Sequence, residues 1–218
     1  MPIHHMLYRC PRCGHDPLDS HRGRAKCSSC GTQFEQGRGA VIIIRPPDGP
    51  PEQSTASNLL ADVERLGGPA LGAQLGERSL FREARIAFGR AEGHGVIRWR
   101  GEVLGFSERI SWKGRGTVRL EGEGLTFEPD QGTGRGGSRQ GGLDQSFSCP
   151  LGDIRGVQIS SRALQITLDG GRLYQFEFLD DSPNRWEDLV CLALTRLYAR
   201  TGQCITEFKP RIILESVR

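Results

Sequence analysis

Four of the seven cysteines stand in two short, matching pairs near the N-terminus. The first pair lies in Cys10-Pro11-Arg12-Cys13-Gly14 and the second in Cys27-Ser28-Ser29-Cys30-Gly31. Two residues inside each pair let both sulfurs face one ion from a tight turn, and the glycine that follows permits the left-handed backbone that closes it. If the two turns lie on opposite arms of a hairpin, the pattern predicts one Zn²⁺ held by Cys10, Cys13, Cys27 and Cys30.

The predicted ligand set consists of thiolates alone and leaves no open position for water or a substrate, which is typical of a structural site. A module this small cannot bury a sufficient core, so metal binding would supply on the order of 10–16 kcal/mol of its folding free energy. The alternative is four unpaired thiols with accidental spacing. The single cysteines Cys149, Cys191 and Cys204 indicate small apolar residues of a protein kept in a reducing compartment.

The segment that carries these two cysteine pairs, residues 8–36, resembles the zinc ribbon superfamily. The resemblance implies a docking module, a scaffold or a nucleic-acid reader. Residues 1–45 hold seven Arg or Lys against three Asp or Glu, so phosphate contacts through residues 8–36 are one interpretation. Only Tyr8 and Phe34 are aromatic in that stretch, which gives no evident platform for base stacking, and a solvated basic face is the alternative.

The elements that must follow the ribbon are less regular. Residues 46–95 are predicted to form a linking region, because Arg45–Ser57 contains four prolines and favours an extended spacer. Apolar residues at helical spacing then predict a short helix from Ser57, its N-cap, to Leu66, ended by Gly67-Gly68-Pro69. Residues 80–91 fit either a helix or a strand, and the helix is slightly favoured.

Residues 96–218 change to a period of two and predict a mainly-β barrel of about seven short antiparallel strands. Gly122-Glu123-Gly124 and Asp169-Gly170-Gly171 are expected hairpin turns. An amphipathic helix capped by Ser182 and ended by Gly202 is expected to close the barrel. The apolar tail at 203–214 is expected to return as a strand or to form an exposed edge.

This element order, with Gly116–Phe127, Cys149–Val157 and the helix that carries Trp186, resembles the pleckstrin-homology superfold and its GRAM-like branch over residues 96–201. The resemblance implies a module that binds anionic headgroups or protein segments, with basic groups around the loop after the first strand. The candidate ligand-binding residues that follow from this are Trp112, Lys113, Arg115, Arg135 and Arg139. The alternative places Trp112 in the core and leaves the charges to solubilise a loop.

No catalytic motif accompanies these modules. The sequence has no His-x4-Asp pattern, no Gly-x-Ser-x-Gly elbow and no Walker-type phosphate loop. The longest strongly apolar run, Ala40–Ile44, is far below the ~20 residues of a membrane span. A net charge of +3 is too mild to imply a nucleic-acid partner by itself.

We therefore expect a non-catalytic, zinc-binding adaptor that recognises a protein partner, an anionic membrane surface, or both. The alternatives are a nucleic-acid-binding or transcription-linked protein and an accessory subunit of a larger enzyme. A cytoplasmic protein, in part peripheral to the membrane, is expected. The abundance of glycine and arginine over lysine indicates a GC-rich bacterial genome.

Overall fold

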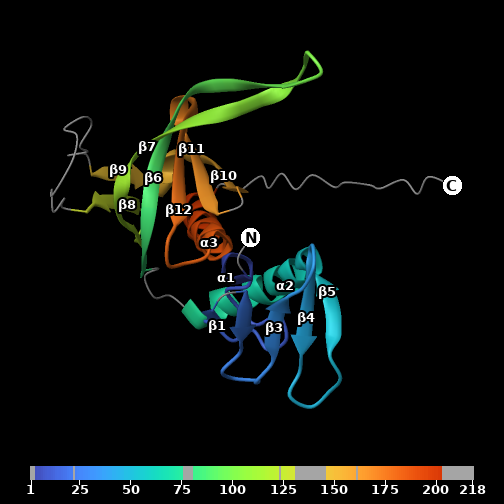
Figure 1. Ribbon diagram of the computed structural model, residues 1–218. Coiled ribbons are helices and arrows are strands. Elements are labelled where there is room, and N and C mark those ends of the chain that lie inside the picture. The colour runs from blue at the N-terminus through green and yellow to red at the C-terminus, as the bar shows by residue number, and fades with distance from the viewer. Residues whose placement is uncertain are drawn as a thin grey trace.

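The chain folds into two units, each built on one antiparallel sheet with its own hydrophobic core (Figure 1). The computed structural model describes residues 3–21, 23–75, 81–122, 124–130, 146–160 and 162–202. The first sheet has five strands in the order β1-β2-β3-β4-β5, and the second has seven in the order β10-β11-β12-β6-β7-β8-β9.

The first unit combines short strands with two helices. Its elements are α1 (Ile3–Met6), β1 (Asp19–His21), β2 (Arg24–Lys26), β3 (Gln33–Gln36), β4 (Val41–Arg45), β5 (Glu52–Thr55) and α2 (Ala56–Leu75). Phe34 of β3 and Ile42 and Ile44 of β4 pack with Leu59 and Val63 of α2. The helix therefore closes the core of the first sheet and belongs to that unit.

The expected linking region differs from the structure in two ways. Glu52–Thr55 pairs with β4 as the last strand of the first sheet, so the proline-rich stretch before it is a turn between two paired strands. The helix runs on to Leu75, past Gly67-Gly68-Pro69. Glycine and proline have low helix propensity, but tertiary contacts override that preference here. Helix α2 packs on the first sheet, and Arg9 donates a hydrogen bond to the Leu66 carbonyl (3.3 Å).

The N-cap of α2 also differs by two residues from the prediction. The Thr55 hydroxyl oxygen accepts a hydrogen bond from the amide of Asn58 at 3.2 Å, which is the geometry of an N-cap. Thr55, the last residue of β5, therefore caps the helix in place of Ser57.

The second unit is mainly β with one C-terminal helix, as expected. Its elements are β6 (Phe81–Trp99), β7 (Glu102–Glu121), β8 (Gly124–Pro129), β9 (Phe147–Pro150), η1 (Leu151–Asp153), β10 (Ile154–Ser160), β11 (Ala163–Leu168), η2 (Asp169–Gly171), β12 (Arg172–Phe178) and α3 (Pro183–Thr201). The expected closed barrel is not found: within the described ranges, the end strands β9 and β10 each pair on one side only.

The preference for a helix over residues 80–91 is wrong, because Phe81–Trp99 forms strand β6. This strand lies at the centre of the sheet and pairs with β12 on one side and β7 on the other. The side chains of Ala84, Ile86 and Phe88, at alternate positions of β6, are buried in the core. Both strands that pair with β6 come from later in the chain. The second unit thus takes in residues 81–95, which the sequence had assigned to the linking region.

Helix α3 covers one face of the second sheet. Trp186, Leu189, Val190 and Leu194 belong to the same core as the strands, as the amphipathic pattern predicts. Gly202 ends the helix in the left-handed conformation. Ser182 stands at the N-cap position, but its hydroxyl donates to the carbonyl of His5 in the first unit (2.7 Å) and does not cap the helix.

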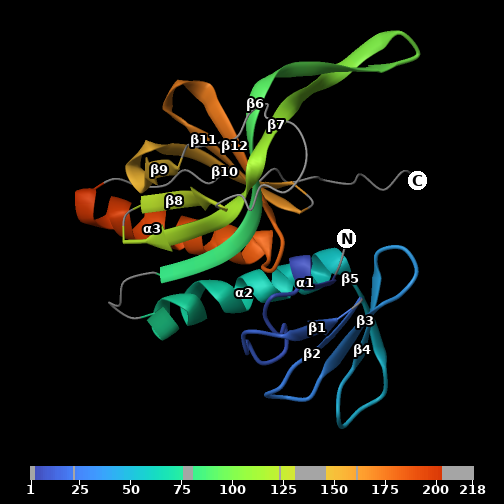
Figure 2. The ribbon, with the colours of Figure 1, turned by 60° about the vertical axis from the view of Figure 1, so that its left-hand side comes forward.

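Strands β6 and β7 are much longer than their neighbours and project from the sheet as a two-stranded hairpin (Figures 1 and 2). The pairing of β12 with β6 stops at Arg90, and the pairing of β8 with β7 begins at Gly116. We call residues 91–115 the arm. From the pairing of Ala91 with Ile110 to the turn, each of its strands extends about 30 Å at the usual rise of ~3.3 Å per residue.

Candidate metal centre and exposed arm

The two cysteine pairs form the same backbone turn. In the first, the amide of Gly14 donates to the Cys10 carbonyl (2.9 Å); in the second, the amide of Gly31 donates to the Cys27 carbonyl (3.0 Å). The glycines have φ of +72° and +74°, the conformation expected for closing each turn. The amide of the first cysteine in each pair donates to a carbonyl five residues later, that of His15 or Thr32 (both 2.9 Å).

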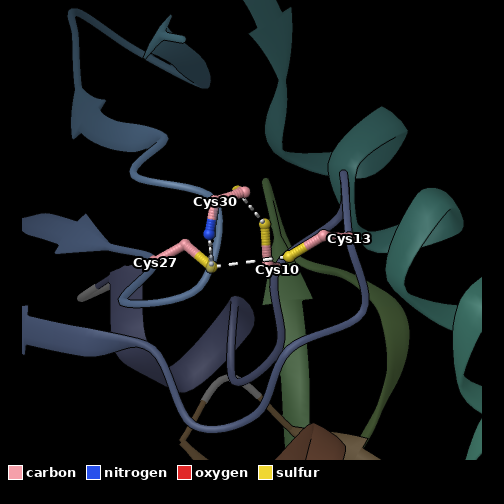
Figure 3. A group of neighbouring side chains, drawn as sticks. All are labelled: Cys10, Cys13, Cys27 and Cys30. Atoms are coloured by element: carbon pink, nitrogen blue, oxygen red, sulfur yellow. Dashed lines mark hydrogen bonds between the residues drawn. The ribbon is translucent and has the colours of Figure 1, made fainter. Parts of the chain in front are cut away.

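The two turns bring the four sulfurs together, as Figure 3 shows. The sulfur of Cys10 lies 3.6 Å from that of Cys30, and the sulfur of Cys13 lies 3.5 Å from that of Cys27. All four lie within 4.8 Å of one another. A tetrahedral Zn²⁺ with Zn–S bonds of about 2.3 Å needs sulfurs about 3.8 Å apart, whereas a disulfide needs about 2.05 Å. The cluster therefore fits a divalent metal and does not form disulfides.

The surroundings of the sulfurs favour a bound cation. Burial raises the pKa of the Cys10 and Cys27 thiols, so charging both requires a positive partner. Burial acts in the same direction on Cys30, but hydrogen bonds from Thr32 outweigh it and lower the pKa of that thiol to about 6. The Cys30 amide also lies 3.4 Å from the Cys27 sulfur, an N–H donor for a thiolate.

The arm carries the second candidate site. Arg100 (φ +50°) and Gly101 (φ +87°) form a two-residue turn that joins Trp99 to its partner Glu102. Large apolar side chains on both strands are exposed, including Trp99 (63% exposed) and Leu104 (64%). Val96, Ile97, Val103 and Trp112 are also exposed.

The arm's charges are only partly compensated. Lys113 forms an ion pair with Glu92, and Glu108 lies 3.2 Å from the ring of His94. Four arginines of the arm have no carboxylate partner among the described residues: Arg98, Arg100, Arg109 and Arg115. In the sheets themselves, arginines such as Arg119 and Arg155 are ion-paired. Uncompensated positive charge and exposed apolar surface therefore coincide on the arm.

The predicted ligand-binding residues are placed as follows. Trp112 is half exposed (50%), so its alternative assignment to the core is wrong. Lys113 and Arg115 lie at the base of the arm, on the same strand as Trp112. Arg135 and Arg139, like the predicted tail at 203–214, fall outside the described residues.

The tip of the arm was missed from the sequence. Trp99, Leu104, Arg98 and Arg100 were not singled out. The strand ending at Trp99 was not recognised as one that begins before residue 96 and forms a long hairpin with the next strand. The available signal was Arg100-Gly101 between two runs of alternating residues, a two-residue hairpin connection.

No protein-family model and no curated protein matches this chain. Among solved structures, the pleckstrin homology domain of ArhGAP27 is similar over 53% of this chain and 99% of that chain, with 16% sequence identity and a TM-score of 0.33. A likeness this weak assigns no function, and the fold described above rests on strand order and register. None of the helices in the described ranges is both long and apolar enough to span a bilayer.

Proposed function

We propose that this chain is a non-catalytic adaptor in which a zinc-ribbon unit, held by one structural Zn²⁺ on Cys10, Cys13, Cys27 and Cys30, carries a pleckstrin-homology-like unit to an anionic membrane surface. Four thiolates fill a closed tetrahedron, so the metal would stabilise the fold and take no part in a reaction. The observation that carries the membrane proposal is the arm, where exposed apolar side chains lie beside arginines that have no carboxylate partner among the residues described.

The chemistry of the tip suits the boundary between headgroups and acyl chains. Tryptophan is favoured at that depth, and arginine is favoured against anionic headgroups. Each arginine near such a surface contributes about 1 kcal/mol, so Arg98 and Arg100 at the tip would give salt-sensitive docking. The outer edges of the arm are unpaired in the described chain, so docking would be shallow, because hydrocarbon leaves open backbone groups unsatisfied.

Vesicle flotation tests this function. The wild type is expected to float with vesicles of phosphatidylcholine and phosphatidylserine, to ignore phosphatidylcholine alone, and to release as salt rises. Arg98→Glu with Arg100→Glu should weaken binding at least about tenfold, because two favourable contacts become repulsive. Arg38→Glu, which reverses the charge of an exposed arginine in the first unit, is the matched control and should bind like the wild type.

A protein partner is a second candidate, and the unpaired edges of the arm favour it. An extended segment can add to such an edge through main-chain hydrogen bonds. If the wild type ignores anionic vesicles, the membrane proposal is wrong and strand addition becomes the better explanation of the arm. A nucleic-acid role for residues 8–36 has less support, because Arg12 and Arg24 in that stretch are ion-paired with Glu52 and Glu35.

A further inference from the structure

The two units meet through buried polar groups at the start of α3. Ser182 and Asn184 donate hydrogen bonds to the carbonyl of His5, at 2.7 and 2.9 Å. The Tyr8 hydroxyl donates to Asp188. Tyr8, Ser182 and Asn184 are all buried, so neither face of this contact exchanges its hydrogen bonds with water while the units are docked.

Arg185 is the centre of the contact. One guanidinium nitrogen, Nη1, donates to Asp181 of its own unit at 2.6 Å. The other, Nη2, donates to the carbonyl of Tyr8 at 3.1 Å and forms an ion pair with Asp16. The guanidinium also lies over the Tyr8 ring, 5.1 Å from its centre. Arg185 is 8% exposed, so these partners are its environment.

The two first-unit partners of Arg185 flank the first cysteine turn. Tyr8 stands two residues before Cys10, and Asp16 stands three residues after Cys13. The amide of Cys10 in turn donates to the carbonyl of His15, beside Asp16. A single side chain of the second unit therefore holds both ends of the loop that supplies half of the predicted metal ligands.

We infer that Arg185 couples metal binding in the first unit to its docking on α3. The inference rests on the proposed zinc site. The metal fixes Cys10 and Cys13, which sets the distance between the Tyr8 carbonyl and the Asp16 carboxylate that Arg185 bridges. Without the metal the loop loses that constraint, and the docked arrangement is one of many it can adopt. Linkage is reciprocal: the factor by which the metal strengthens docking equals the factor by which docking strengthens metal binding. Removing the bridge should therefore weaken metal binding.

The coupling is tested by the Zn²⁺ affinity of the full-length protein, measured by competition with a chromogenic chelator. Arg185→Ala is expected to bind one Zn²⁺ at saturation with an affinity about 5- to 150-fold below that of the wild type, the usual range for coupled sites. Asp16→Ala, which leaves the Arg185–Asp181 pair in place, should act in the same direction and serves if Arg185→Ala does not fold.

Arg82→Ala is the matched control. Arg82 donates to the same Asp181, at 2.7 Å, and both residues belong to the second unit, so its removal should leave the Zn²⁺ affinity unchanged. An affinity of Arg185→Ala and Asp16→Ala equal to that of the wild type overturns the coupling alone. A wild type that takes up no zinc overturns the metal centre itself.

The coupling can also be tested in the reverse direction, by removing the metal from the wild type. Chelation should raise amide hydrogen exchange in residues 182–186, and unchanged exchange there also overturns the coupling.

Discussion

The two units of this chain reach a stable core by different routes. The core of the first unit is built around strands of three to five residues, and two of its buried residues, Cys10 and Cys27, are also predicted metal ligands. The core of the second unit contains stacked aromatic rings from several strands and a face of α3, with Cys149 as its only cysteine among the buried residues described. If the proposed metal is bound, we expect the first unit to depend on it for stability and the second unit to depend on apolar packing.

The sharpest way to break this comparison is to remove one metal ligand. Cys13→Ser should abolish Zn²⁺ binding and unfold the first unit, since structural zinc supplies on the order of 10 kcal/mol in such modules. The second unit should keep a cooperative thermal transition, followed by circular dichroism, while elemental analysis reports the loss of zinc. Cys149→Ser, in a buried position of the second core, is the control and should retain one zinc per chain. Complete unfolding of Cys13→Ser would show that the two cores fold as one.

A cavity in the second core should have the opposite signature. Phe127 is fully buried, and its ring stacks on that of Phe88 with centroids 4.6 Å apart. Phe127→Ala should lower the free energy of unfolding of the second unit by about 3–5 kcal/mol, as measured in urea, while zinc content is unchanged. Phe34→Ala, at an equally buried position of the first core, is the counterpart and should weaken zinc retention. Equal effects of both variants on zinc would contradict the division into two cores.

The same contrast explains what could be predicted from the sequence. The cysteine turns were predictable because their geometry is set within five residues and their glycines have a definite role. The hairpin turns at Gly122 and Asp169 and the amphipathic face of α3 are local in the same sense, and the structure confirms them. These signals place a candidate metal centre and a mainly-β unit.

Predictions that depend on distant partners were wrong. Phe81–Ala91 is ambiguous by pattern, and its strand conformation is imposed by β12 and β7 on its two sides. Helix α2 continues through Gly67-Gly68-Pro69 because it packs on the first sheet. The contact between Arg185 and residues 8–16 joins segments about 170 residues apart, so no local pattern announces it.

Asp181, which holds Arg185 in place, should give an effect of intermediate size. Its carboxylate accepts hydrogen bonds from Arg82, Arg185, the Trp186 indole and the amide of Ser182. Asp181→Asn should lower the free energy of unfolding by about 1.5–3 kcal/mol at neutral pH, the range for hydrogen bonds to a charged group. Chemical denaturation of the full-length protein measures it.

This effect should depend on pH in a defined direction. Burial alone would raise the pKa of Asp181, but the hydrogen bond from Arg82 and the charges of Arg185 and Arg82 hold that pKa below its ordinary value. A lowered folded-state pKa stabilises the protein above the unfolded carboxyl pKa of about 3.9, and this contribution is lost as pH falls further. The difference between the wild type and Asp181→Asn should therefore shrink below about pH 4. Metal release in acid affects both proteins and cancels in this difference. A stability difference that grows as pH falls would contradict the assigned charges.

The smallest expected change comes from the arm, which extends the comparison beyond the two cores. Trp99→Ala should alter the free energy of unfolding by less than about 0.5 kcal/mol, because the side chain is exposed and contacts neither core. The same variant should reduce flotation with anionic vesicles, since Trp99 is the aromatic residue at the tip. A loss of more than about 1 kcal/mol, measured in urea, would mean that Trp99 is packed in solution. Dependence of that loss on protein concentration would identify a second copy of the chain as what covers it.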